Sequence, residues 1–132
     1  LSVDGLVETF NAKGDHWSFA RVDDNNIVTE VTEKKRISNN CSNGLYFFKN
    51  IDVFKESYFY LYKKDHSILG NILNENYIAP MYNYMIEKEM KVINRCVKSD
   101  FILASGIPKE YYFLKSKYIN KSQLENLFLE FN

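Results

Sequence analysis

The feature of this sequence that most constrains its fold is a change in the spacing of apolar residues near Lys49. Before Lys49, apolar residues form short runs separated by turn-forming residues, which is typical of β-strands. After it, they recur at intervals of three and four, which is typical of a helix packed on one side. Residues 90–97 then return to strand-like alternation. This order predicts an α/β fold, with a mixed sheet, a β-hairpin and flanking helices.

Four strands are predicted in the first 48 residues, at 3–10, 18–22, 27–33 and 43–48. The run Asp23-Asp24-Asn25-Asn26 separates the middle two. Asp and Asn favour turns and tolerate positive φ, so these two strands are expected to form a hairpin. The fourth strand contains four apolar residues in succession, from Leu45 to Phe48. That run predicts a strand buried on both faces.

Three helices and a terminal helical segment are predicted after Lys49. The first, with Asn50 as its N-cap, carries a stripe of apolar residues: Ile51, Phe54, Tyr58, Leu61 and Tyr62. The second begins at Pro80 or, alternatively, near Glu75 with a kink at the proline. The third begins at Pro108, and a capping box at Ser122–Glu125 predicts a short terminal helix.

The charge balance and the cysteines exclude several classes of protein. The 132 residues include 17 basic and 17 acidic side chains, so no net field attracts nucleic acid or an anionic membrane surface. No apolar run approaches the ~18–20 residues needed to cross a bilayer, and no secretory signal is recognisable. Cys41 and Cys96 match no metal-binding spacing and are expected to be free thiols. These features together predict a cytoplasmic protein.

Several short segments, taken in order, resemble one enzyme family. They are DGLVETF from Asp4, VTEVTEKKRIS from Val28, NGLYFF from Asn43, ENYIAPMYN from Glu75 and SGIPKEY from Ser105. From about residue 4 to residue 114, the chain resembles the C-terminal half of bacterial sugar-phosphate nucleotidyltransferases. The resemblance implies a Rossmann-like fold of the glycosyltransferase-A type. It also implies synthesis of a nucleotide-sugar from a nucleoside triphosphate and a sugar 1-phosphate, with Mg²⁺ and release of pyrophosphate.

The same resemblance implies how the protein is organised. Residues 1–132 would form the acceptor-binding part, which holds the sugar. The N-terminal nucleotide-binding part, with its Gly-rich start and phosphate-binding cations, would lie outside this chain. The first residue is Leu1 rather than Met, which agrees with that expectation. The chain alone is expected to be inactive and, by exposing an apolar interface, to be capable of homo-oligomerisation. The implied pathway is bacterial capsule or lipopolysaccharide precursor synthesis.

Glu33 and Lys34 match the sugar-site pair of this family. A carboxylate can accept hydrogen bonds from sugar hydroxyls, and a lysine can place a compact charge on the sugar phosphate. Neighbouring residues of a regular strand point to opposite faces, so both can reach one substrate only if the strand ends or bulges there. The alternative is that these residues form a solvated, charged strand end.

Two further pairs complete the candidate substrate-binding set. Asn43 and Gly44 match the position where the family's backbone passes close to the sugar, with a strand-entry glycine or a bulge as the alternative. Glu75 and Tyr77 match an acidic-aromatic segment of the family. For Tyr82 and Asn83, which follow it, a structural role is expected.

The chain also departs from the family pattern. Ala104 stands where many members have a metal-binding Asp, and Ile107 stands where they have a helix-capping Thr. No residue here is therefore a confident Mg²⁺ ligand, although Asp100 lies nearby, and the catalytic residues stay unassigned. Two alternative functions follow: a catalytically inactive nucleotidyltransferase-like domain that binds a ligand or partner, and an unrelated Tyr-rich binding module.

Overall fold

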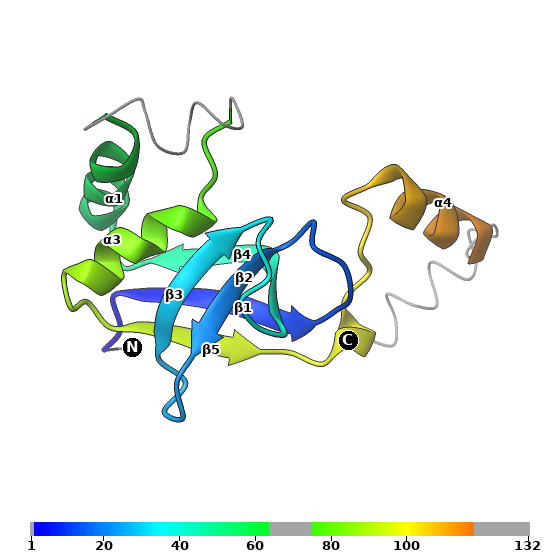
Figure 1. Ribbon diagram of the computed structural model, residues 1–132, viewed down its shortest axis with the longest axis horizontal. Coiled ribbons are helices and arrows are strands. Elements are labelled where there is room, and N and C mark those ends of the chain that lie inside the picture. Colours follow the sequence, from blue (N-terminus) through cyan, green and yellow to red (C-terminus); the bar gives the residue numbers. More distant parts are fainter. Residues whose placement is uncertain (1, 64–74, 118–132) are drawn as a thin grey trace. The chain divides into compact units, whose positions relative to one another are not determined.

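The computed structural model describes residues 2–63 and 75–117 of the chain. The chain divides into two compact units, residues 1–99 and 100–132. The first unit contains five strands: β1 (Gly5–Asn11), β2 (Ser18–Val22), β3 (Val28–Glu33), β4 (Asn40–Phe48) and β5 (Val92–Cys96). Its helices are α1 (Ile51–Lys63), the 3₁₀ turn η1 (Ala79–Met81) and α3 (Tyr82–Glu87). The expected α/β fold with a mixed sheet is confirmed (Figure 1).

The sheet of the first unit has the order β3-β2-β4-β1-β5. The pairings within this order are antiparallel except between β1 and β5, which run parallel. The sheet is strongly curled, so that its two edges approach each other. An isolated bridge joins Ile27, just before β3, to Ile93 of β5. The Asn94 N–H also donates to the Asn26 carbonyl, with N and O 2.9 Å apart.

The predicted hairpin is confirmed. The Asp23 carboxylate accepts hydrogen bonds from the backbone N–H groups of Asn25 and Ile27. Asn26 adopts a φ of 62°, a value that asparagine tolerates better than most residues. The turn chemistry of this run therefore fixes which ends of β2 and β3 meet, and Ser18 pairs with Glu33 at the far end of the hairpin.

Helix α3 closes the hydrophobic core against the sheet. Tyr82 and Met85 are fully buried, in a cluster with Val7, Ala20, Val28, Val31, Ala79 and Val92. The Tyr82 hydroxyl lies within hydrogen-bond distance of the Leu6 and Phe47 carbonyl oxygens, at 3.1 and 2.9 Å. Burial raises the pKa of this phenol, which stays protonated. The structural role expected of Tyr82 is confirmed.

Asn83 is also structural. Its side chain accepts from the Val31 N–H at 2.9 Å and donates to the Val31 carbonyl at 2.8 Å. Strand β3 is at an edge of the sheet, so its backbone groups need partners that no further strand provides. The Asn83 amide supplies both partners to one residue of that edge.

Helix α1 begins as predicted, with the Val53 N–H donating to Oδ1 of Asn50 at 2.9 Å. Its buried face differs from the predicted stripe. Ser57 is fully buried, and its hydroxyl donates to the Val53 carbonyl within the helix. Ile51, the first residue of the helix, is 59% exposed. Helical spacing therefore identified the helix but misplaced one end of its packed face.

Strand β4 contradicts one expectation. Tyr46 and Phe48 pack against the core, whereas Leu45 and Phe47 are 50% and 40% exposed. Alternate residues of a strand face opposite sides, and only one side of β4 is packed on the core cluster. The prediction of burial on both faces is therefore wrong for the described residues.

The second helical segment begins beside the proline, with η1 starting at Ala79 and α3 at Tyr82. Residues 75–78 are not helical, so the alternative start near Glu75 is wrong, and Pro80 lies inside η1, directly before α3. The strand predicted at 90–97 is confirmed as β5. Of the two thiols, Cys41 is buried and Cys96 is exposed, and both are free.

Beyond Ser99 the described chain holds the 3₁₀ turn η2 (Ser99–Phe101), which crosses into the second unit, and α4 (Pro108–Lys117), which confirms the third predicted helix. Ile107 has no side-chain group to cap α4, but the Glu110 carboxylate accepts from the N–H groups of Gly106 and Ile107, which supplies the other half of a capping box. The terminal helix predicted at Ser122–Glu125 lies outside the described residues. Within residues 2–63 and 75–117, no helix is long and apolar enough to span a membrane.

Candidate functional site

The sugar-site candidates Glu33 and Lys34 lie at the end of β3. The strand ends at Glu33, and Lys34 adopts a left-handed conformation with a φ of 54°. The Lys34 N–H still donates to the Trp17 carbonyl, with N and O 3.0 Å apart. The strand therefore ends where the two side chains could begin to share one side of the sheet, as expected.

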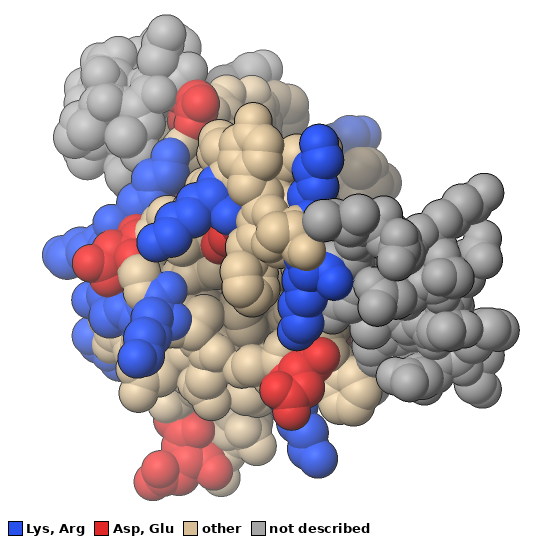
Figure 2. Space-filling model, turned by 90° about the vertical axis from the view of Figure 1, so that its right-hand side faces the viewer, with Lys and Arg blue, Asp and Glu red and all other residues tan. Residues whose placement is uncertain are grey.

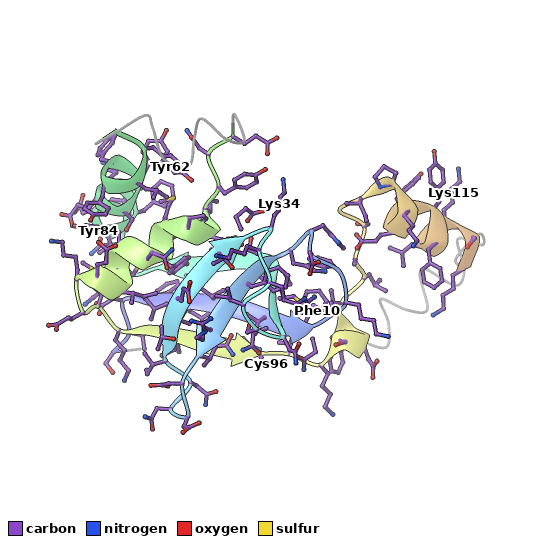
Figure 3. The ribbon with its side chains drawn as sticks, viewed as in Figure 1. Phe10, Lys34, Tyr62, Tyr84, Cys96 and Lys115 are labelled. Carbon is purple, nitrogen blue, oxygen red and sulfur yellow. The ribbon has the colours of Figure 1, made fainter. Side chains whose placement is uncertain are left out.

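The Lys34 ammonium contacts two residues of the segment that leads into α3. Its Nζ donates to the Tyr77 hydroxyl at 2.6 Å and lies 4.7 Å from the centre of the Tyr77 ring. Glu75 Oε2 lies 4.0 Å from Nζ and accepts a hydrogen bond from the Tyr77 hydroxyl. In Figure 3 the Lys34 side chain extends beyond the end of β3 toward this segment. The structure thus brings together three candidates from two distant parts of the sequence.

Glu33 is held by residues of two neighbouring strands. Its Oε2 accepts from the Ser18 hydroxyl at 2.5 Å, and Ser18 Oγ accepts from the Tyr46 hydroxyl at 3.3 Å. Tyr46 lies two residues after Gly44 on β4, so these hydrogen bonds link Glu33 to the strand that carries Gly44. Sequence reasoning missed Ser18 and Tyr46. The hairpin was predicted without a register; the observed register pairs Ser18 with Glu33, so extending the prediction from the Asp23–Asn26 turn along both strands could have identified the serine.

Helix α1 contributes two tyrosines that sequence reasoning treated only as core residues. The Tyr62 hydroxyl donates to the Tyr77 carbonyl at 2.6 Å, and the Tyr58 hydroxyl accepts from Nδ2 of Asn76 at 3.2 Å. Burial, with smaller contributions from nearby Tyr58 and Glu33, raises the pKa of Tyr62 to about 12. Tyr62 therefore remains a hydrogen-bond donor throughout the neutral pH range.

Asn43 and Gly44 form a bulge in β4. The register between β1 and β4 passes from Val7–Tyr46 to Thr9–Ser42, so Glu8 alone faces residues 43–45. The Asn43 amide donates to Oε1 of Glu8 at 2.8 Å, and Arg95 pairs with the other carboxylate oxygen at 3.3 Å. The structure therefore places the Asn43 side chain against β1, and within residues 2–63 and 75–117 no hydrogen bond joins it to the Lys34 side chain.

Gly44 is required by the backbone of this bulge. Its φ is 91°, a value that residues with a Cβ rarely adopt. A Cβ built there would meet no atom within 4 Å, so the space beside the residue is open. Gly44 is thus an exposed point of bare backbone on the strand linked to Glu33.

The described residues do not fit a bound Mg²⁺ ion. Within residues 2–63 and 75–117, no three His, Cys, Asp or Glu side chains are grouped so as to hold a metal. Ala104, in the second unit, offers no side-chain oxygen at the position where the resemblance implies a ligand. Figure 2 shows Lys and Arg side chains with Asp and Glu side chains among them on the face that it draws, so the charges there are mixed.

The fold defined by this curled mixed sheet and its helices is of the nucleotidyltransferase type. A similar solved structure is that of a nucleoside-diphosphate-sugar pyrophosphorylase from Vibrio cholerae RC9, with a TM-score of 0.72 and 32% sequence identity. The match covers 83% of this chain but 45% of the other, so this chain spans less than half of that protein. No protein-family model and no curated protein sequence matches the chain.

Proposed function

We propose that this chain is the sugar-binding half of a sugar-phosphate nucleotidyltransferase that joins a nucleoside triphosphate to a sugar 1-phosphate and releases pyrophosphate. The similarity to a nucleoside-diphosphate-sugar pyrophosphorylase supports this class. The observation that carries the proposal is the Glu33–Lys34 pair at the end of β3, with Tyr77 and Glu75 placed on the lysine.

The two residues would divide the work of binding a sugar phosphate. The Glu33 carboxylate has one oxygen held by Ser18, which leaves acceptor capacity for sugar hydroxyls. Lys34, which is about half exposed, can reach a phosphate oxygen. Two anions must meet in the reaction, so a positioned cation on the acceptor phosphate lowers their repulsion.

The backbone of Lys34 supports a functional role. A non-glycine residue in the left-handed region costs roughly 1–2 kcal/mol, and such strain gathers at functional sites. A solvated strand end would tolerate glycine or asparagine at this position without that cost. The presence of a lysine with a φ of 54° therefore favours a need for its ammonium group.

The exposed backbone at Gly44 would form one side of the sugar-binding site. A sugar ring can approach a glycine closely because no Cβ intervenes, and the space beside Gly44 is open. Asn43 would shape the bulge through Glu8 rather than contact the sugar with its amide. In this proposal, Gly44 contacts the sugar and Asn43 stabilises the bulge that contains Gly44.

The remaining machinery would belong to other parts of the complete enzyme. The nucleotide-binding half and the residues that hold Mg²⁺ are proposed to lie outside the residues described here. The proposed setting is the bacterial cytoplasm, in the synthesis of precursors for capsule or lipopolysaccharide.

Substitution of Lys34 tests the proposal directly. The wild-type chain is titrated by NMR with a panel of hexose 1-phosphates (glucose, galactose, mannose and N-acetylglucosamine). For the best ligand, Lys34→Ala should raise Kd roughly tenfold or more, as expected for loss of a charge-assisted hydrogen bond. Lys35→Ala removes an equal charge one residue further on and should change Kd less than about twofold.

Lys34→Gly separates binding from stability. Glycine adopts a φ of 54° without strain, so this variant should be at least as stable as Lys34→Ala while binding equally weakly. A wild-type chain that binds none of the sugar phosphates, or a Lys35 effect as large as that of Lys34, would contradict the proposal. In the complete protein, pyrophosphate release with a panel of nucleoside triphosphates tests the reaction itself.

A second candidate function is favoured by Ala104, which cannot act as a metal ligand. In this alternative the protein keeps the nucleotidyltransferase fold and binds a nucleotide-sugar or a partner without catalysis. Calorimetry of the complete protein separates the two functions. Binding of nucleotide-sugar with no pyrophosphate release, under any nucleotide and sugar-phosphate pair of the panel, would support the second.

A further inference from the structure

Residues 75–77 are attached to helix α1 by two tyrosine side chains. The Tyr62 hydroxyl donates to the backbone carbonyl of Tyr77, and the Tyr58 hydroxyl accepts from the Asn76 side chain. The two tyrosines lie one helical turn apart with ring centroids 5.3 Å from each other, so they present neighbouring hydroxyls. One face of α1 thus holds two consecutive residues of a segment that has no helix or strand of its own.

The same segment also holds the Lys34 ammonium, through the Tyr77 side chain. The Tyr77 hydroxyl accepts from Nζ at 2.6 Å and donates to Glu75, so one phenol fixes both charged groups. A free lysine side chain carries about 2 kcal/mol of rotamer entropy. A phosphate therefore binds more tightly to a lysine that is already held in place than to a mobile one.

The contacts of Glu33 do not pass through this segment. Glu33 is held by Ser18 of β2, which is in turn contacted by Tyr46 of β4. The groups proposed to meet the sugar and the group proposed to meet the phosphate are thus supported by different elements. A change in α1 can therefore disturb one without removing the hydrogen bonds of the other.

We infer that Tyr62 is a positioning residue: by fixing the Tyr77 backbone, it sets where Tyr77 holds the Lys34 ammonium, and it thereby raises affinity for the phosphate group of a sugar phosphate. Tyr58 supports the same segment through Asn76. The inference rests on the proposed function for its phosphate ligand. The arrangement from Tyr62 through Tyr77 to Lys34 stands on the contacts alone, and Figure 3 shows Tyr62 on α1 and Lys34 at the end of β3.

The test is Tyr62→Phe, which removes the hydroxyl and keeps the ring. Tyr60→Phe is the matched control, because Tyr60 is on the same helix and its hydroxyl donates to Glu87 at 2.7 Å instead. Kd is measured by NMR for the best-binding sugar 1-phosphate, for the same sugar without phosphate and for inorganic phosphate. The Lys34 ε-methylene resonances are recorded without ligand, since the nearby Tyr77 ring shifts them from their free values.

Loss of one hydrogen bond predicts a rise of about two- to tenfold in Kd for the sugar 1-phosphate and for inorganic phosphate. The Kd of the unphosphorylated sugar should not change, because Glu33 keeps its partners. The Lys34 resonances should move toward the values of a mobile lysine. Tyr77→Phe, which removes the contact with Lys34 directly, should produce the same split with an effect at least as large. Tyr60→Phe should change none of these quantities.

The possible failures are distinguishable. If the wild-type chain binds no sugar phosphate, the proposed function fails, and the Lys34 resonances alone decide whether Tyr62 positions the lysine. If the wild type binds but Tyr62→Phe binds equally well, or if the Lys34 resonances do not move, the positioning role is wrong while the proposed function stands. A parallel loss of affinity for the unphosphorylated sugar would indicate a general structural effect and would also overturn the inference.

Discussion

Lys34 combines an unfavourable backbone conformation with a side chain that is held by an aromatic hydroxyl and a neighbouring carboxylate. These features have a common physical explanation if the ammonium group is needed at one place. Asp4 shows a different use of a charged residue. Its carboxylate accepts from the Lys91 N–H at 2.9 Å and from Lys49 Nζ at 3.1 Å, and so connects β1, β4 and β5 near one end of the sheet.

The contacts of Asp4 predict a dependence of stability on pH. The hydrogen bond from the Lys91 backbone, followed by that from Lys49, lowers the pKa of Asp4 below its unfolded value. The stabilisation is therefore complete above an unfolded pKa of about 3.9 and is lost as pH falls through the folded pKa. We expect Asp4→Asn to lower stability at pH 7 and to reduce the further loss at acid pH, as measured by urea unfolding at several pH values.

The control for this prediction is Asp24→Asn, which removes a carboxylate from the exposed turn of the hairpin. It should lower the unfolding free energy at pH 7 less than Asp4→Asn does. If Asp4→Asn and wild type lose stability in parallel as pH falls, the assigned role of the Asp4 carboxylate is wrong.

At the scale of helices and strands, sequence patterns predicted elements well where local chemistry decides them. The hairpin follows from Asp23 and Asn26, and the start of α1 follows from Asn50, because these side chains act on their own backbone neighbours. The exposed face of β4 was not predictable in this way. Leu45 and Phe47 are apolar, as residues of a buried strand usually are. Only the tertiary structure shows that their side of β4 is exposed.

The candidate site shows the same division. The sequence singled out Glu33, Lys34, Glu75 and Tyr77, and the structure places the last three in contact. The sequence could not indicate Tyr62, because helical spacing makes this residue indistinguishable from an aromatic residue of the core. The role of Tyr62 depends on a hydrogen bond to a carbonyl 15 residues away in the chain, which no local pattern encodes.

The two hydrogen bonds between Asn83 of α3 and Val31 of the edge strand β3 yield a prediction at this scale. Asn83→Ala removes both hydrogen bonds to Val31 and leaves the N–H and carbonyl of a buried residue without these partners. We expect a loss of about 1–3 kcal/mol in unfolding free energy. The substitution should accelerate amide hydrogen exchange more at Val31 than at Val7, which lies on the interior strand β1. Asn25→Ala, in the exposed turn, is the control and should cost less. An equal loss of unfolding free energy in the two variants would show that the Asn83–Val31 hydrogen bonds contribute little to stability.

At the scale of the whole molecule, the described parts of the core and of the candidate site lie within the first unit. The buried cluster runs from Val7 to Val92, and the site residues run from Ser18 to Tyr77, all before the boundary at Ser99. The five strands found among the described residues also end before that boundary, the last of them at Cys96. β5, the last of these strands in chain order, pairs in parallel with β1.

This arrangement predicts that a chain ending at Ser99 folds and binds like the full chain. Its thermal midpoint should lie within a few degrees of the full-length value, and its Kd for the sugar 1-phosphate should agree within about twofold, as checked by circular dichroism and NMR titration. A chain ending at Glu87 loses β5, and with it the fully buried Val92 and the partner strand of β1, so it should fail to fold. If the chain ending at Ser99 is unfolded, the core requires residues of the second unit. If it folds but no longer binds, the second unit contributes to the site, and the assignment of sugar-phosphate binding to the first unit is wrong.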